Sequence, residues 1–223
     1  YEPDLCAGSF RCTALVDHLL RQNIDIHVIT TAPNRYSSFD KKQYYPISDI
    51  IASSQSRLVS ICWIVHDKNN TIMQSRYYII KPDGFIIPEE STKIHKISQE
   101  YAEKRGVSIQ EVFDALHEDI KTYDIKARIA HNFLFDQYIL GSEMYRYGQK
   151  ELLTDWEKVG TFCTMGHGMT HFDFGLNRGG YPKPPRLGEL YYLITNKKLE
   201  NAHNAVVDTE ACAKCYQYMI DNL

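Results

Sequence analysis

The stretch AHNAVVDTEAC, residues 202–212, opens the last long helical pattern of the chain. It places His203 five residues ahead of Asp208. The pattern continues to about residue 220 and repeats on one face at Asp208, Cys212, Cys215 and Met219. This spacing predicts an amphipathic helix that packs against a sheet. A carboxylate on the apolar face is costly unless it has a partner, so Asp208 indicates a site.

A second stretch, AHNFLFD at residues 130–136, sets Asp136 just beyond a short apolar run. Residues 127–130 form the predicted strand, and a helix is expected to follow through about Tyr147. Carboxylates are ligands for hard divalent cations, and histidine is a common general base. The two aspartates and His203 therefore indicate metal-assisted hydrolysis of a phosphodiester.

The rest of the chain predicts an α/β fold. Residues 58–65 and 71–80 read as two strands that form a hairpin across the turn at 67–70. Ser108 begins a capping-box pattern, and apolar residues follow it at helical spacing. Strands first, then alternating helices and strands, favour a mixed β-sheet flanked by helices.

The N-terminal residues have a different character. Residues 8–20 have a helical pattern, residues 24–30 read as a strand, and residues 32–35 as a loop. This is a helix–strand pair without the strand expected before it. We place a boundary near residues 39–41, which divides the chain into an appended segment, 1–40, and a main domain, 41–223.

Composition limits the function classes. The chain has 223 residues, 43% hydrophobic and 24% charged, with a formal net charge of −3. This composition is globular, and the missing basic excess argues against coating of long nucleic acid. No apolar run is long enough to span a membrane, and we expect no signal peptide before Tyr1, which indicates a fragment. The 6 cysteines form no compact pattern, so reduced thiols and a cytoplasmic location are expected.

From about residue 42 onward, the chain resembles the DEDDh 3′–5′ exonucleases, a ribonuclease H-like family that includes the proofreading subunit of a bacterial replicative polymerase. His131 to Asp136 resembles the second motif of that family, and His203 to Asp208 resembles the third. The segments 94–98, 163–165 and 187–190 fall where the family has its intervening segments. The resemblance implies a ribonuclease H-like fold and removal of nucleotides from a 3′ end.

The resemblance also implies residue roles. Asp136 and Asp208 would hold two Mg²⁺ or Mn²⁺ ions, and His203 would take a proton from the attacking water. Three residues are expected near the substrate: Asn132, Phe135 and His95. The implied partners are the 3′ end of single-stranded DNA or RNA and a polymerase or other replication or repair protein, with no membrane.

The first motif of the family, an Asp-x-Glu at the end of the first strand, does not occur before Arg57. Asp40 stands about where its aspartate belongs, but Lys42 replaces the glutamate. Asp25 has His27 two residues later, and it lies early in its strand. A lysine beside two cations would repel them. Impaired hydrolysis, or a non-catalytic relative that binds a strand end, is therefore the first alternative.

Residues 1–39 resemble instead the start of nucleotide-sugar-dependent glycosyltransferases with twin Rossmann-like domains. Such a fragment lacks the second domain, so the resemblance implies a fusion that replaced the first strand of the exonuclease. Residues 24–31 can still fill the central strand position, because apolar alternation decides that position. A remnant of a glycosyltransferase is the second alternative.

Simpler roles exist for several of these residues. Asp136 and His203 are also suited to helix capping. A zinc site at Cys163, His167 and His171 is conceivable, but Gly166 and Gly168 favour a loop there. Cys212 and Cys215 are expected to be buried as small apolar residues. Residues 181–186 read as a rigid linker, or as a basic aromatic rim that touches a strand.

Overall fold

The computed structural model describes residues 26–33 and 57–223. In this part of the chain, one sheet has the strand order β3-β2-β1-β4-β5. The strands are β1 (Ile26–Pro33), β2 (Leu58–His66), β3 (Ile72–Ile79), β4 (Ala127–Ala130) and β5 (Gly160–Cys163). β1 is antiparallel to β2 and parallel to β4, and β4 is parallel to β5. The predicted mixed α/β sheet is confirmed.

The central strand comes from the segment that was expected to be appended. Residues 24–30 were predicted as a strand, and β1 occupies Ile26–Pro33 instead, shifted toward the C-terminus. Val28 is the register partner of Ile129 on β4, and Thr30 is the partner of Cys62 on β2. The expectation that this segment fills the central position is confirmed. The domain boundary near residues 39–41 lies outside the described residues.

Eight helices belong to the described residues. They are α3 (Glu89–His95), α4 (Gln99–Arg105), α5 (Ile109–Thr122), α6 (Phe133–Arg146), α7 (Lys150–Lys158), α8 (Thr164–His171), α9 (Leu187–Thr195) and α10 (Ala205–Asn222). Local sequence fixes several starts. The side chains of Ser98, Ser108 and Asn204 accept backbone N–H bonds at the beginnings of α4, α5 and α10. The predicted helices at α5, α6 and α10 are confirmed.

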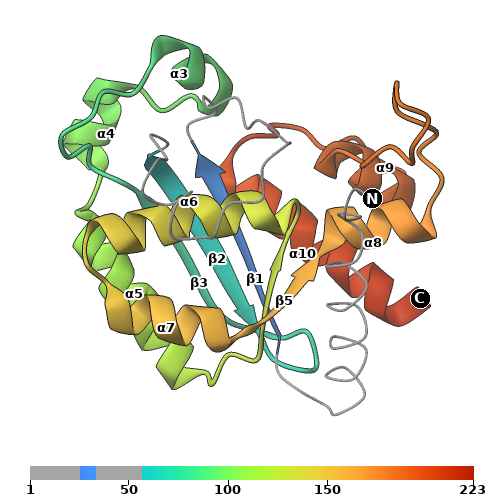
Figure 1. Cartoon of the computed structure of the whole chain (residues 1–223), viewed down its shortest axis with the longest axis horizontal. Helices are drawn as coiled ribbons and strands as arrows, with labels where there is room; N and C mark the ends of the chain where they lie inside the picture. Colours follow the sequence, from blue (N-terminus) through green and yellow to red (C-terminus); the bar gives the residue numbers. More distant parts are fainter. Residues whose placement is uncertain (1–25, 34–56) are drawn as a thin grey trace, which may run out of the picture.

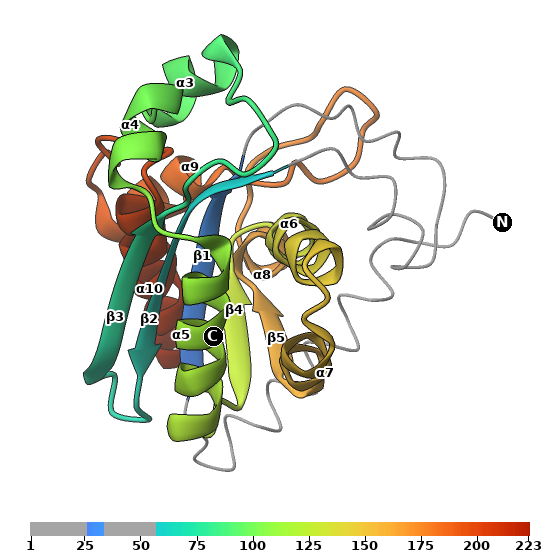
Figure 2. The ribbon, with the colours of Figure 1, turned by 90° about the vertical axis from the view of Figure 1, so that its left-hand side faces the viewer.

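The helices cover both faces of the sheet (Figures 1 and 2). On one face, Ile61, Trp63 and Val65 of β2 join the buried core beneath α5, α6 and α7. On the other face, Ile129 of β4 and Phe162 of β5 pack with α9 and α10. The two faces of the sheet therefore carry separate cores, one built on β2 and the other on β4 and β5.

Cys212 and Cys215 are fully buried in the second core, as predicted. The prediction of a loop around Gly166 and Gly168 is wrong, because Thr164–His171 forms α8. A Cβ on Gly168 would lie 3.2 Å from the Pro185 side chain and 3.3 Å from that of Leu190. The glycine therefore allows close approach of α9 and does not break the helix.

One buried carboxylate fastens α6 to the start of β2. Glu143 of α6, 1% exposed, accepts bonds from the Leu58 backbone N–H and from Nε of Arg57, both at 2.9 Å. Arg146 pairs with its other oxygen at 2.8 Å. Because Leu58 is paired with Pro33, this clamp sets α6 against the end of β1.

None of the helices in the described part of the chain combines the length and the apolar character that crossing a bilayer demands.

Candidate active site at the carboxyl edge of the sheet

The carboxyl ends of β1, β4 and β5 meet at one edge of the sheet, because these strands are parallel. β4 is followed by His131 and β5 by Thr164. The Thr209 hydroxyl of α10 donates to the Cys62 carbonyl at 3.3 Å, and Cys62 pairs with Thr30 near the end of β1. The first turn of α10 therefore lies beside the end of β1 (Figure 1).

Asp136 lies in the first turn of α6 and is buried. A carboxylate at this position is stabilised by the N-terminal end of the helix dipole. Burial is the main cause that raises the pKa of the Cys212 thiol well above its usual value, and the charge of Asp136 adds to this effect. Cys212 lies on α10, one helical turn beyond Asp208, so the electrostatics of that helix include the charge of Asp136.

Asp208 lies in the first turn of α10 and binds the loop that precedes it. Its two carboxylate oxygens accept from the His203 backbone N–H at 3.1 and 3.3 Å. The His203 backbone has a φ of 74°, in the left-handed region, and its side chain is exposed. The structure thus brings Asp208 and His203 together through the main chain and leaves the imidazole open to solvent.

His131 links three elements at the same edge. Its Nδ1 lies 3.0 Å from the Thr164 hydroxyl, and its Nε2 lies 3.0 Å from the Pro185 carbonyl. A carbonyl only accepts, so Nε2 carries the proton and Nδ1 accepts from Thr164. Burial lowers the pKa of His131 to about 4, so the ring is neutral at neutral pH.

The Thr164 hydroxyl also lies 3.6 Å from Sγ of Cys212. The His131–Thr164 pair therefore connects the end of β4 and the start of α8 with α10. Sequence reasoning included His131 in a motif and Thr164 in the segment 163–165, and it gave neither residue a role. A threonine directly after a short strand gives no signal of its own in a single sequence.

The remaining predicted residues differ in their surroundings. Asn132 is exposed, with a φ of 65°, and it immediately precedes α6. Phe135 is half-buried and packs against the core under α5 to α7, which is a sufficient reason for an aromatic residue there. His95 is buried at the end of α3, where its Nδ1 accepts from the Ile97 N–H at 3.1 Å. Asp40 lies outside the described residues.

Asp136 and Asp208 supply the oxygen donors that Mg²⁺ and Mn²⁺ prefer, so the residue types fit a hard cation. Among the described residues, these two and His203 do not form a cluster whose ligand atoms all lie within 4.8 Å. The strand β1 contains no aspartate or glutamate, so it adds no carboxylate at its end.

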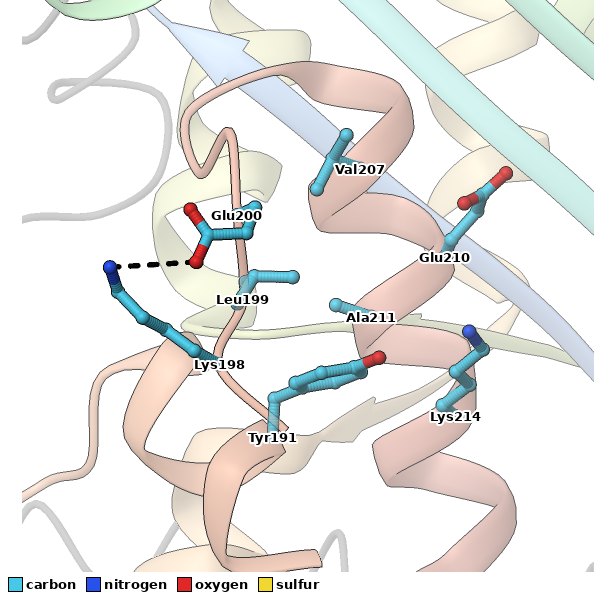
Figure 3. A pocket seen from close by; sticks show the side chains of 8 residues that line it. All are labelled: Tyr191, Lys198, Leu199, Glu200, Val207, Glu210, Ala211 and Lys214. Carbon is cyan, nitrogen blue, oxygen red and sulfur yellow. Dashed lines mark ion pairs between the residues drawn. The ribbon is translucent and has the colours of Figure 1, made fainter. Parts of the chain in front are cut away.

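A pocket of about 180 Å³ lies between α9 and α10 (Figure 3). Tyr191 and Lys214 stand on one side of it, and Lys198 pairs with Glu200 at 3.5 Å on the other. Val207 lines it, whereas Asp208 does not. The pocket therefore opens on another face of α10 and is separate from the candidate site.

The family model described as Exonuclease (RNase_T) matches residues 48–216. The chain belongs to this exonuclease family. The resemblance to ribonuclease H-like 3′–5′ exonucleases is thereby confirmed. No curated protein matches the chain.

Solved structures of exonuclease I share the fold. The Escherichia coli enzyme in complex with a dT13 oligonucleotide has 13% identity and a TM-score of 0.61, with 89% of this chain and 41% of that chain covered. The zinc-bound form of the E. coli enzyme with single-stranded DNA has 14% identity and a TM-score of 0.65, at the same coverage.

Exonuclease I from Methylocaldum szegediense has 13% identity and a TM-score of 0.62, again with 89% and 41% covered. This chain therefore spans about two fifths of the length of these exonucleases. The comparisons give no support to a glycosyltransferase origin of residues 1–39.

Proposed function

We propose that this exonuclease-family chain removes nucleotides from the 3′ end of single-stranded DNA or RNA by hydrolysis. The observation that carries the proposal is the placement of Asp136 and Asp208. Each lies in the first turn of a helix, on elements that meet at the carboxyl edge of the sheet, in a chain of the exonuclease family. The oligonucleotide complexes of exonuclease I agree with a single-stranded substrate.

Each of the candidate residues would have a role that suits its side chain. The Asp136 and Asp208 carboxylates would hold divalent cations, which supply positive charge for the attacking and leaving oxygens. His203, exposed beside Asp208, would take a proton from the attacking water. Asn132, at the solvent-exposed start of α6, would contact the strand end. A polymerase or repair protein as partner stays a prediction.

His131 has a positioning role in this proposal. A neutral ring bonded to Thr164 on one side and to Pro185 on the other fixes the start of α6 relative to α8. It is not a base at this site, because burial keeps its pKa near 4 and its proton is engaged by a carbonyl.

The sequence of β1 favours a second candidate function. β1 holds the central position, where the family pattern has Asp-x-Glu, and its sequence IHVITTAP offers no cation ligand of that kind. Among the described residues the site has the carboxylates of Asp136 and Asp208, and two carboxylates bind a cation more weakly than four, since each ligand contributes both charge and coordination. The second candidate is therefore a domain that binds a 3′ end without cleaving it.

One assay separates the two. A 5′-labelled single strand is incubated with Mg²⁺ or Mn²⁺ and the chain, and products are resolved by length. Stepwise shortening that a blocked 3′ end prevents supports hydrolysis. Asp208→Asn should lower the rate by about 10²-fold or more, because it keeps an oxygen for the His203 N–H but loses the charge. Glu210→Gln is the matched control, since Glu210 is exposed on the same helix.

An intact strand that still shifts in a gel with the wild-type chain would establish the second candidate. A chain that neither cleaves nor binds single strands would refute both. Equal rates for wild type and Asp208→Asn would show that the cleavage arises elsewhere.

A further inference from the structure

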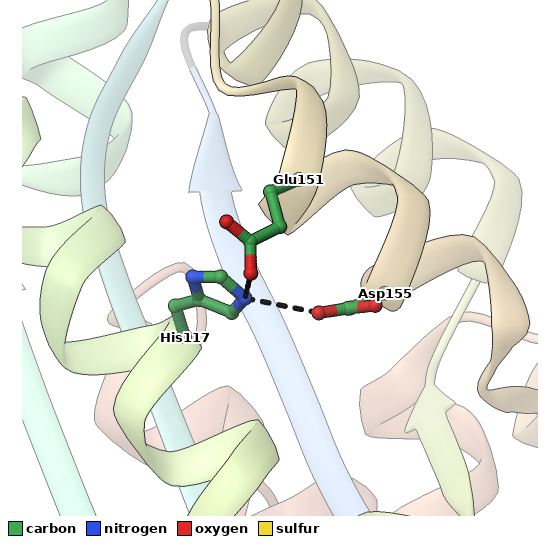
Figure 4. A group of neighbouring side chains, drawn as sticks. All are labelled: His117, Glu151 and Asp155. Carbon is green, nitrogen blue, oxygen red and sulfur yellow. Dashed lines mark hydrogen bonds and ion pairs between the residues drawn. The ribbon is translucent and has the colours of Figure 1, made fainter.

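We propose that His117, Glu151 and Asp155 form a binding site for a zinc-class divalent cation that joins α5 to α7. His117 comes from α5, and the two carboxylates come from successive turns of α7, so that all three side chains point toward one another (Figure 4). The site is independent of the proposed nuclease site.

The three ligand atoms lie at separations that one cation could bridge after a small adjustment. Nε2 of His117 lies 3.1 Å from Oδ2 of Asp155 and 4.0 Å from Oε1 of Glu151, and all the ligand atoms lie within 4.8 Å of one another. Bonds of about 2.1 Å at tetrahedral angles separate neighbouring ligand atoms by about 3.4 Å. Small side-chain movements of Glu151 would therefore close the shell around one cation.

The donor set selects the class of metal. One imidazole nitrogen and two carboxylates suit zinc and neighbouring transition metals, whereas Mg²⁺ prefers oxygen ligands and retains water. Three protein ligands leave one position for water. The side chains of His117 and Asp155 are 20% and 25% exposed and that of Glu151 is 74% exposed, so the site lies at the surface and is reachable from solvent.

Two lysines pair with the carboxylates of this cluster. Nζ of Lys121 lies 2.8 Å from Oε1 of Glu151, the same oxygen that faces His117. Nζ of Lys158 lies 3.0 Å from Oδ1 of Asp155, while Oδ2 faces the ring. Only Lys121 therefore competes directly with a metal for a ligand atom.

The site lies away from the carboxyl edge of the sheet. α7 lies below α6 in the view of Figure 2, whereas β1 ends toward the top. A metal that joins α5 and α7 would fasten two helices over the larger core, so its effect is on stability.

The test measures metal binding to the whole chain. Zinc is titrated with excess Mg²⁺ present, which fills oxygen-only sites, and thermal unfolding is recorded in parallel. A zinc concentration about 100-fold above the Kd should raise the Tm by about 5–10 °C. His117→Gln should weaken binding by more than about 10-fold and remove the shift. Co²⁺ should give visible bands of tetrahedral coordination.

Two lysine variants sharpen the test. Lys121→Met frees Oε1 of Glu151 and should tighten zinc binding several-fold, whereas Lys158→Met should change it little. Asp208→Asn should leave it unaltered, which distinguishes this site from the nuclease site. Zinc binding that survives His117→Gln but is lost in His171→Gln would place the metal at α8 and overturn the proposal. Absence of any His117-dependent binding would also overturn it.

Discussion

Replacing Asp119 by alanine tests the account of the core beneath β2. Asp119 is 1% exposed and accepts three hydrogen bonds. The indole N–H of Trp63 donates at 2.8 Å, and Arg76 donates through Nε at 2.8 Å and Nη2 at 2.9 Å. Glu118, the neighbouring carboxylate, pairs with Arg76 at 3.2 Å and is 67% exposed.

The expected cost follows from these contacts. Asp119→Ala leaves the indole N–H of Trp63 buried without its acceptor, which costs about 1–3 kcal/mol. Arg76 also loses a charged partner, and removal of one member of a buried pair costs about 3–5 kcal/mol. Because the Arg76 side chain is 24% exposed, water offsets part of this cost. We therefore expect Asp119→Ala to lower the free energy of unfolding by about 3 kcal/mol, the lower limit for removing one member of a buried ion pair.

Urea unfolding followed by far-ultraviolet circular dichroism measures this cost, since tryptophan fluorescence would report the mutation itself. The midpoint should fall with an unchanged slope. Asp119→Asn should cost less than Asp119→Ala, because its amide oxygen still accepts from Trp63. Glu118→Ala is the matched control and should cost below about 1 kcal/mol. A loss below about 1 kcal/mol for Asp119→Ala, or an equal loss for Glu118→Ala, would refute the reasoning.

Three further outcomes are expected. Burial lowers the pKa of His131 to about 4, below the ordinary value near 6.5, so the unfolded chain binds more protons between these values. Stability should therefore fall as the pH drops through that window, by up to about 1.4 kcal/mol per pH unit, and urea midpoints of His131→Asn should lack this component. Cys212 and Cys215 should resist alkylation at neutral pH until the chain unfolds, because burial raises both thiol pKa values, that of Cys215 to about 12; early labelling in site-resolved mass spectrometry would contradict this. Gly106→Ala should cost about 1–3 kcal/mol in urea unfolding, because the new Cβ would lie 2.4 Å from the Ala102 carbonyl oxygen; a neutral effect would show that the backbone yields.

The long periodic segments could be predicted from the sequence. β2, α5 and α10 have strong apolar patterns and, for the two helices, a side-chain cap, so local signals and tertiary packing agree. α8 was missed because Gly166 and Gly168 read as helix breakers. The close packing of Gly168 against Pro185 and Leu190 explains why a residue without a side chain is suited to that helix.

The candidate site was predictable only in part. Asp136 and Asp208 stood out because carboxylates follow apolar runs, and their helices lie where the motifs place them. The bond from the His203 N–H to Asp208, and the His131–Thr164 link, depend on the meeting of separate elements. No spacing within one segment encodes such contacts.

The composition of β1 has a consequence for what the fold can tell about activity. A sheet recruits its middle strand through main-chain bonds, which almost any extended, apolar segment can offer. Folding therefore sets no requirement for acidic groups on that strand, and β1 takes the central position without any. The same sheet can form whether or not a chain carries the residues that cleavage needs, so the fold by itself does not identify a working enzyme.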